Sequence, residues 1–137
     1  MIKTTTITNV DELLKLWPRL LSLTVKQNTP ITTDQLLRLL LHSLEHGAVF
    51  IVRGDSGVIG LCCVECVKNS VVLRMLPKDG GQRIGKECLQ GVSDWAKSLG
   101  HKTIQVSTTN LCGSSFRYFE KTLGFHRHTV TFTKELV

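Results

Sequence analysis

Hydrophobic residues recur at helical spacing in the first third of the chain. Residues 10–26 carry the first such pattern, and Pro18 inside it predicts a kink or a split. Thr32, with Gln35 three residues later, has the spacing of a capping box, and the apolar pattern that follows stops at Gly47. We therefore expect two helices at the start of the chain.

The period then changes to that of strands. Runs of β-branched and apolar residues are separated by turn-forming residues, and they cover residues 48–54, 58–67 and 70–76. Short turns between successive strands favour antiparallel pairing, so these runs predict an antiparallel meander.

A third helical pattern begins at Ile84 and ends at Gly100, a good helix stop. The remaining predicted elements are a strand over 103–107, a short helix over 114–123 ended by Gly124, and a strand over 128–134. The order is ααβββαβαβ, with no internal repeat and no linker. Because 137 residues with 42% hydrophobic composition suit one core, we expect a single domain over residues 1–137.

Charge and cysteine content indicate which partners and which cellular compartment to expect. A net charge of +6 favours anionic partners such as nucleotides, phosphorylated cofactors or nucleic acid. The five cysteines and the polar opening, which does not match a signal peptide, predict reduced thiols in the cytoplasm. No run approaches the ~20 apolar residues of a membrane span, so we expect a soluble protein.

The turn before the third helix carries the clearest candidate chemistry. Gly80 and Gly81 let the backbone approach a ligand closely, Gly85 leaves the first helical turn open, and Arg83 and Lys86 add positive charge. Helix N-termini present unpaired N–H groups that bind phosphate. The pattern indicates an anion site, although many Gly-Gly turns before helices are only turns.

A strand, then GGQRIG, a helix, a strand, a short helix and LGF resemble the GNAT superfamily of N-acetyltransferases, over the whole chain. The resemblance implies an α/β (α+β) single-domain GNAT fold. In that fold a mixed, mostly antiparallel sheet is accompanied by two N-terminal helices, a cofactor-binding helix and a short C-terminal helix. It also implies acetyl-CoA as cosubstrate and no metal.

The resemblance assigns the cosubstrate contacts. The pyrophosphate turn matches Gly80, Gly81, Gln82, Arg83, Ile84 and Gly85, with Lys86 after it and the strand end Met75 and Leu76 before it. Gly80 stands where Gln or Arg is usual, and Arg83 stands where glycine is usual. A side chain at position 83 must therefore point away from the diphosphate or pair with it.

A second segment of the family corresponds to Asn110 and residues 116–125. The resemblance implies that Asn110 contacts the pantetheine arm and that a tyrosine protonates the departing thiolate. Phe119 takes the usual tyrosine position and Tyr118 lies beside it, about 100° away on a helix. Tyr118 is the candidate acid if the helix is rotated or shifted in register.

The general base is less defined, because the strand at residues 70–76 lacks the glutamate that some members carry. Glu65 on the adjacent strand is our candidate, with His126 and His128 as alternatives. Cys112 could act covalently only with a base beside it, and Ser114 is better explained as a helix cap.

Three other motifs have simpler explanations. Cys63 and Cys66 have CxxC spacing, but alternation on a strand places them on opposite faces, which favours core packing. His42 and His46 form an HxxEH motif without an identifiable third metal ligand. Dispersed basic residues and few aromatics argue against a dedicated nucleic-acid module.

The sequence thus predicts direct transfer of an acetyl group from acetyl-CoA to an amine. A small molecule, a protein amine and an aminoacyl-tRNA all stay open as the acceptor, and a homodimer stays open as the oligomeric state. The alternative is a non-catalytic binding or assembly module with the same fold, suggested by Gly80, Arg83 and Phe119.

Overall fold

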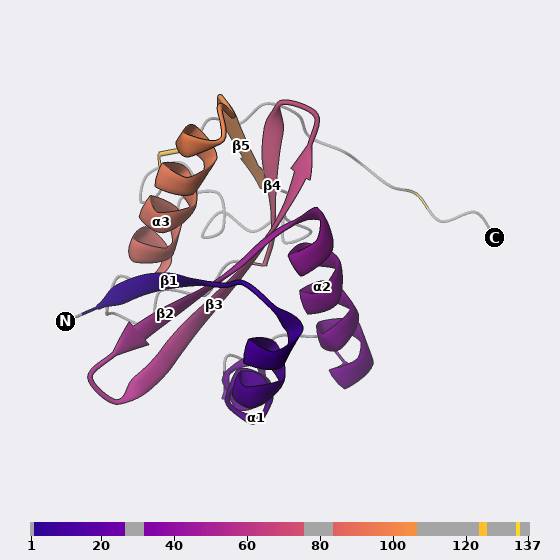
Figure 1. The fold of residues 1–137 in the computed structure, drawn as a ribbon, viewed down its shortest axis with the longest axis vertical. Coiled ribbons are helices and arrows are strands. Elements are labelled where there is room, and N and C mark those ends of the chain that lie inside the picture. The colour runs from indigo at the N-terminus through magenta and orange to yellow at the C-terminus, as the bar shows by residue number, and fades with distance from the viewer. Residues whose placement is uncertain (1, 27–31, 76–83, 107–123, 126–133, 135–137) are drawn as a thin grey trace. The chain divides into compact units, whose positions relative to one another are not determined.

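A computed structural model of the chain describes residues 2–26, 32–75, 84–106, 124–125 and 134. Its elements are β1 (Lys3–Ile7), α1 (Val10–Lys26), α2 (Thr33–His46), β2 (Gly47–Gly54), β3 (Gly57–Val67), β4 (Ser70–Met75), α3 (Ile84–Ser98) and β5 (Thr103–Val106) (Figure 1). All of them lie in the first of the two units into which the chain divides, Met1–Ser107 and Thr108–Val137.

The five strands form one sheet in the order β1-β2-β3-β4-β5. The pairs β1–β2, β2–β3 and β3–β4 are antiparallel, whereas β5 runs parallel to β4. The β2–β3 turn contains Gly57 at φ 111°, a conformation that a residue with a Cβ rarely adopts. The predicted meander and the mixed, mostly antiparallel sheet are therefore confirmed.

The predicted element order is wrong at its start, because β1 precedes the two helices. Lys3–Ile7 pairs along the edge of the sheet, with Thr4 opposite Val52 and Thr6 opposite Phe50. The three threonines hide the strand from a search for apolar alternation, yet their β-branched side chains suit a half-buried edge. The helix predicted over 114–123 and the strand predicted over 128–134 fall almost wholly outside the described residues.

The two N-terminal helices begin and end close to where the pattern places them. Helix α1 runs continuously through Pro18, so the predicted split does not occur. Proline removes the N–H that would bond to the carbonyl of Leu14, and Leu14 lies on the exposed side of the helix, where water can replace that bond. The capping box of α2 is confirmed: Gln35 N donates to Thr32 Oγ1 over 3.1 Å, and Thr32 N donates to Gln35 Oε1 over 2.9 Å.

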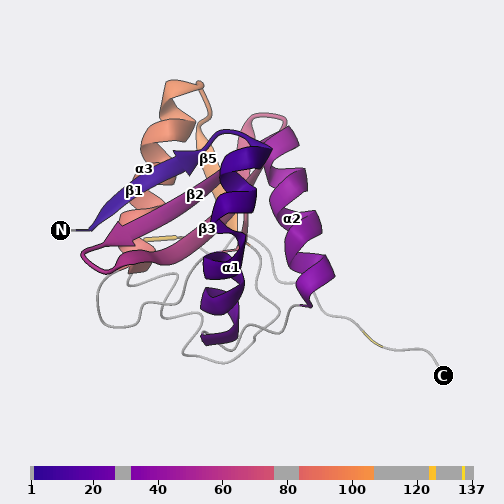
Figure 2. The same ribbon diagram turned by 60° about the horizontal axis from the view of Figure 1, so that its bottom comes forward.

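Helices cover both faces of the sheet (Figures 1 and 2). Helices α1 and α2 bury one face, where Leu13 and Leu40 belong to the same cluster as Val49, Ile51 and Cys63. Helix α3 covers the other face. On that side the strands bury side chains that alternate with those of the first face, and α3 adds its own buried residues. The strand residues are Phe50, Val52, Cys62, Val64, Val71 and Leu73, and the α3 residues are Cys88, Val92 and Ala96. The sheet is therefore the middle layer of three.

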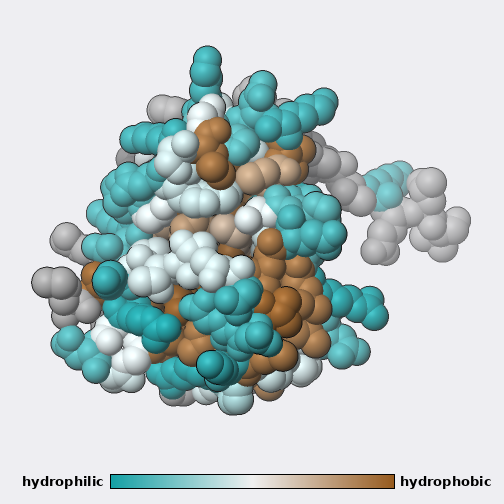
Figure 3. Space-filling model, in the orientation of Figure 1, coloured by the Kyte–Doolittle hydropathy of each residue, from teal (hydrophilic) through white to brown (hydrophobic). Residues whose placement is uncertain are grey.

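The outer surface of the α1–α2 layer is partly apolar. Figure 3 shows hydrophobic side chains exposed in the region of these two helices. Among the described side chains of α1 and α2, the exposed large hydrophobic residues are Val10, Leu14 and Leu41, and Leu14 is 56% exposed. Among the described residues, no helix combines the length and the apolar character needed to cross a membrane.

Candidate active site

Strands β4 and β5 define one end of the sheet at which a ligand can bind. They pair in parallel from Ser70 opposite Thr103 to Leu73 opposite Val106. Helix α3 connects them, and a helix that connects two parallel strands must run antiparallel to both. The N-terminus of α3 therefore lies at the carboxyl end of β4, the arrangement in which open sheets place ligands and in which helix N–H groups face an anion.

Strand β4 is irregular just before it ends. In the register with β3, Cys63 faces Met75 and Val64 faces Leu73, so Arg74 is the extra residue of a bulge. A bulge interrupts the ladder of backbone bonds, bends the strand and redirects a side chain. The irregularity thus lies next to Met75, which was predicted as a cosubstrate contact, and Arg74 reaches Glu65 on the α2 face of the sheet.

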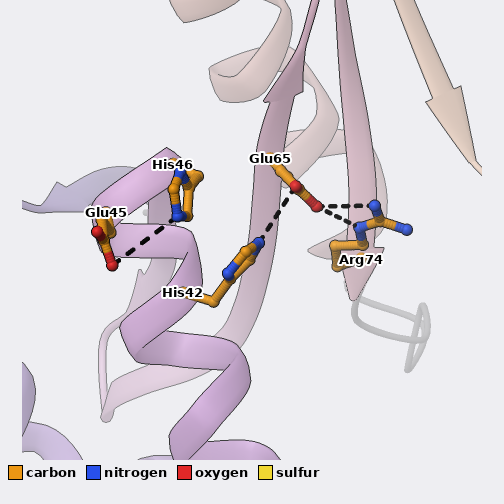
Figure 4. Close-up of polar contacts among 5 residues, drawn as sticks. All are labelled: His42, Glu45, His46, Glu65 and Arg74. Atoms are coloured by element: carbon orange, nitrogen blue, oxygen red, sulfur yellow. Dashed lines mark hydrogen bonds and ion pairs between the residues drawn. The ribbon is translucent and has the colours of Figure 1, made fainter.

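Glu65 on β3 connects two basic side chains on that face (Figure 4). Its Oε2 accepts from Arg74 Nε over 2.9 Å and lies 2.7 Å from Arg74 Nη2. Its Oε1 lies 3.2 Å from His42 Nε2, which extends from α2. The Glu65 side chain is 19% exposed, whereas those of Arg74 and His42 are 45% and 47% exposed. The cluster therefore opens to solvent through its basic members.

This pairing determines the acid–base character of Glu65. The hydrogen bond from Arg74 is the main cause that lowers the pKa of the carboxyl below its ordinary value, and the hydrogen bond with His42 adds to it. A carboxylate with a lowered pKa is a weaker proton acceptor. Glu65 is therefore ionised at neutral pH, but it is less basic than an unpaired carboxylate.

Only some of the other predicted site residues lie in the part of the chain that the structure describes. Met75 ends β4, and Ile84, Gly85 and Lys86 form the start of α3, where Lys86 is exposed. The remaining predicted site residues lie outside the described residues: Leu76, Gly80, Gly81, Gln82, Arg83, Asn110, Cys112, Ser114, Tyr118, Phe119, His126 and His128. Their roles stay predictions.

The CxxC spacing of Cys63 and Cys66 does not produce a shared ligand site on β3. Cys63 packs on the α1–α2 face and Cys66 extends from the opposite side of β3, so the two thiols cannot share a ligand without breaking the strand. Burial raises the pKa of Cys63 to about 12. In the described part of the chain, no three His, Cys, Asp or Glu side chains are grouped for a metal ion.

The contacts of Glu65 with Arg74 and His42 were not predicted from the sequence. Arg74 was predicted only as part of the strand over residues 70–76, and His42 was considered only as part of the HxxEH motif. A basic residue on the strand next to a glutamate is a weak signal for an ion pair, and here the bulge changes which residues face each other. The contact between His42 and Glu65 depends on how α2 packs, which the sequence does not show directly.

Comparison with known proteins shows which fold this chain shares. The sequence matches no protein-family model and no curated protein. Solved structures do match over nearly the full chain. The aminoglycoside N-acetyltransferase AAC(6')-Iy, in complex with the bisubstrate analogue CoA-S-monomethyl-acetylneamine, is 16% identical with a TM-score of 0.72, and the match covers 100% of this chain and 99% of that one.

Two further matches come from named bacteria. The ribosomal-protein-S18-alanine N-acetyltransferase from Escherichia coli is 14% identical with a TM-score of 0.74, covering 94% of this chain and 80% of that one. A GNAT-family acetyltransferase from Staphylococcus aureus Mu50 is 22% identical with a TM-score of 0.70, covering 94% and 87%. At such low identity the likeness concerns the backbone, and it shows that the chain has the GNAT acetyltransferase fold.

Proposed function

We propose that the protein is an N-acetyltransferase that transfers an acetyl group directly from acetyl-CoA to an amine. The observation that carries this proposal is the end of the sheet where β4, with its bulge at Arg74, leads toward the N-terminus of α3. Structures that share the fold include complexes with CoA and with a CoA-based bisubstrate analogue. We place the cosubstrate of this chain at that end of the sheet, because the N–H groups of a helix N-terminus face an anion there.

The described residues fit acetyl-CoA at this position. The N-terminus of α3 offers backbone N–H groups and the positive end of the helix dipole to a diphosphate, and Lys86 is exposed beside it. In this proposal the turn residues Gly80, Gly81, Gln82 and Arg83 complete the phosphate contacts. The resemblance adds Met75, Leu76, Asn110 and Phe119 to the cosubstrate contacts.

The chemistry requires three contributions from the chain. Backbone N–H groups near Met75 stabilise the negative charge that develops on the acetyl oxygen. Tyr118 donates a proton to the departing thiolate. Glu65 assists the removal of a proton from the attacking amine. When bound, acetyl-CoA supplies the activated acetyl group, and most of the remaining acceleration comes from holding the amine close to it.

The acceptor is an amine whose class the site does not yet restrict. Aminoglycosides and the alanine of a ribosomal protein are the acceptors named for two proteins of the same fold, so both small-molecule and protein amines are reasonable probes. The +6 charge also keeps an aminoacyl-tRNA in the panel. A cytoplasmic setting is part of the proposal, because Cys62, Cys63, Cys66 and Cys88 are free thiols.

A second candidate is a non-catalytic module that keeps the fold for binding. The observations that favour it are Gly80, Arg83 and Phe119 at positions where the family uses other residues. In that case the chain would keep the same fold but would have lost cosubstrate binding or the acid for thiolate release.

Release of free thiol from acetyl-CoA tests the proposal. The purified protein is incubated with acetyl-CoA and a panel of amines that includes neamine, a peptide with an N-terminal alanine, and an aminoacyl-tRNA. We expect at least one amine to give thiol release together with an acetylated product detected by mass spectrometry, and Tyr118→Phe to slow it. A folded protein that acetylates no amine, and does not bind acetyl-CoA, would support the non-catalytic module instead.

A further inference from the structure

The proton acceptor of the proposed reaction can be identified more closely from the contacts of Glu65. Both of its oxygens are engaged, because Arg74 contacts Oε2 through two nitrogens and His42 contacts Oε1. Hydrogen bonds to an ionised carboxylate stabilise the charged form and weaken it as a base. Glu65 is therefore better suited to hold a neighbour in place than to take the proton itself.

His42 has the complementary property. Its Nε2 faces Glu65 over 3.2 Å, and an ionised carboxylate can only accept hydrogen bonds, so Nε2 must carry the hydrogen. In the neutral ring the other nitrogen, Nδ1, then holds a free lone pair. The ring is 47% exposed, so a substrate amine or one bridging water can reach it.

We propose that His42 Nδ1 accepts the proton of the attacking amine, with Glu65 and Arg74 as positioning residues. This inference rests on the proposed function and adds a catalytic residue to it. Arg74 fixes the carboxylate from the β4 bulge, and the carboxylate fixes the imidazole from β3. The result is an array of three side chains from α2, β3 and β4, all on one face of the sheet (Figure 4).

The step balances as an ordinary acyl transfer. The amine nitrogen forms a bond to the acetyl carbon while its proton passes to His42 Nδ1, and the carbon–sulfur bond breaks with its electron pair going to sulfur. The positive charge gained by the imidazole is stabilised by Glu65, in the way that a carboxylate supports a catalytic histidine in hydrolases. A proton from Tyr118 then neutralises the thiolate. Solvent takes the proton from His42 and returns one to Tyr118, so both side chains regain their starting forms.

His46 provides a matched control on the same helix. Its ring lies against that of His42, with centroids 4.5 Å apart, and both side chains are about half exposed. However, His46 Nε2 lies 3.8 Å from Glu45, which is itself strongly exposed, and Glu65 does not contact it. The two histidines thus share their surroundings but differ in the carboxylate that orients the ring.

The first test needs no cosubstrate. Long-range nitrogen–proton NMR spectra of the free protein at about pH 8, where an ordinary imidazole is neutral, report which ring nitrogen carries the hydrogen. His42→Gln and His46→Gln assign the signals. We expect His42 to show only the Nε2–H form, and Glu65→Ala to convert it to a mixture of both forms. A dominant Nδ1–H form in the wild type would overturn the inference.

The second test measures turnover, with neamine and acetyl-CoA as the first probe and any amine that the panel identifies afterwards. We expect His42→Gln to lower the rate about a hundredfold, as removal of a general base does, while His46→Gln stays close to wild type. Calorimetry should show the same acetyl-CoA affinity for both variants. Equal activity of the two variants would overturn the role of His42.

The experiments distinguish a failure of the proposed function from a failure of the inference about His42. If the wild-type protein does not bind acetyl-CoA, the proposed function fails, while the NMR result still reports on the His42–Glu65 pair. If the wild type binds acetyl-CoA and acetylates an amine but His42→Gln does so equally well, the function stands and the inference about His42 is wrong.

Discussion

Arg74 and Glu65 form an ion pair in which two guanidinium nitrogens contact one carboxylate oxygen, at 2.9 and 2.7 Å. The pair crosses from β4 to β3 at the bulge, so it connects the irregular strand end to the regular sheet. A planar guanidinium can donate from both nitrogens at once, which a lysine cannot. The pair therefore fixes the position of Glu65 as well as its charge.

Replacing Arg74 should change how stability depends on pH. Because the folded protein lowers the pKa of Glu65, the pair contributes stability above the carboxyl's value in the unfolded chain, about 4, and loses it as the pH falls through the lower folded value. We expect Arg74→Met to lower Tm at neutral pH and to approach the wild type near pH 3. Thermal melts from about pH 3 to 7 measure this.

The control for that comparison is Arg53→Met, which removes a basic residue from β2 without touching Glu65. Its Tm difference from the wild type should not follow the same acid-dependent course. A constant difference between Arg74→Met and wild type over the whole pH range would show that the pair makes no contribution through ionisation of Glu65.

The close approach of Thr4 to Gly91 determines how Gly91→Ala changes the free energy of unfolding. Alanine normally stabilises a helix relative to glycine by about 1 kcal/mol, but a Cβ at Gly91 would lie 2.7 Å from Thr4 Cγ2. We expect Gly91→Ala to destabilise the fold by about 1–3 kcal/mol, because β1 or α3 must shift. Chemical denaturation measures the free energy of unfolding.

Thr4→Ser tests whether that contact is the cause. Serine lacks the methyl group but keeps the hydroxyl that donates to the Glu87 carbonyl over 3.1 Å. In the Thr4→Ser background, Gly91→Ala should become neutral or stabilising, giving a coupling of at least about 0.5 kcal/mol between the two sites. Additive effects would show that the loss at Gly91 has another origin.

Much of the fold could be predicted because its elements carry clear periodic patterns. The helix from Ile84 and the strands β2, β3 and β4 begin and end within a residue or two of the predicted bounds. Strand β1 was missed because its burial depends on tertiary contacts, with Thr4 packed under α3, and not on an apolar pattern. Of the two outcomes predicted at Pro18, a kink or a split, the split does not occur, because a helix tolerates proline where the freed carbonyl faces water.

The site was less predictable for physical reasons. Glu65 could be selected as an acid–base candidate from its place on the strand beside β4, but its partners depend on two tertiary features. The bulge at Arg74 changes the cross-strand register, and the rotation of α2, set by buried Leu36 and Leu40, directs His42 toward the sheet. Neither feature has a reliable signature in a single sequence.

The thiols of β3 should differ in reactivity. Cys62 and Cys63 are buried with raised pKa values, whereas Cys66 is only partly buried; burial, and then the charge of Glu65, raises the pKa of Cys66. We expect iodoacetamide at about pH 8 to spare Cys62 and Cys63 in the native protein and to modify Cys66 slowly. Glu65→Gln should accelerate the reaction of Cys66. Peptide mass spectrometry quantifies each site.

Unfolding the protein in denaturant provides the control for this experiment, since all three thiols should then react at similar rates. Rapid native modification of Cys63 would contradict its placement in the core. An unchanged rate at Cys66 in Glu65→Gln would show that the carboxylate does not influence that thiol.

Calorimetric titration with acetyl-CoA tests the central claim most directly. Moderate salt is needed to screen nonspecific attraction of phosphates to a protein of charge +6. The account predicts one site with micromolar affinity in the wild type, and loss of that site in Gly85→Glu, which places a negative side chain at the start of α3, provided that circular dichroism shows the variant folded. No binding to folded wild-type protein, or unchanged affinity in folded Gly85→Glu, would contradict the placement of the cosubstrate at this end of the sheet.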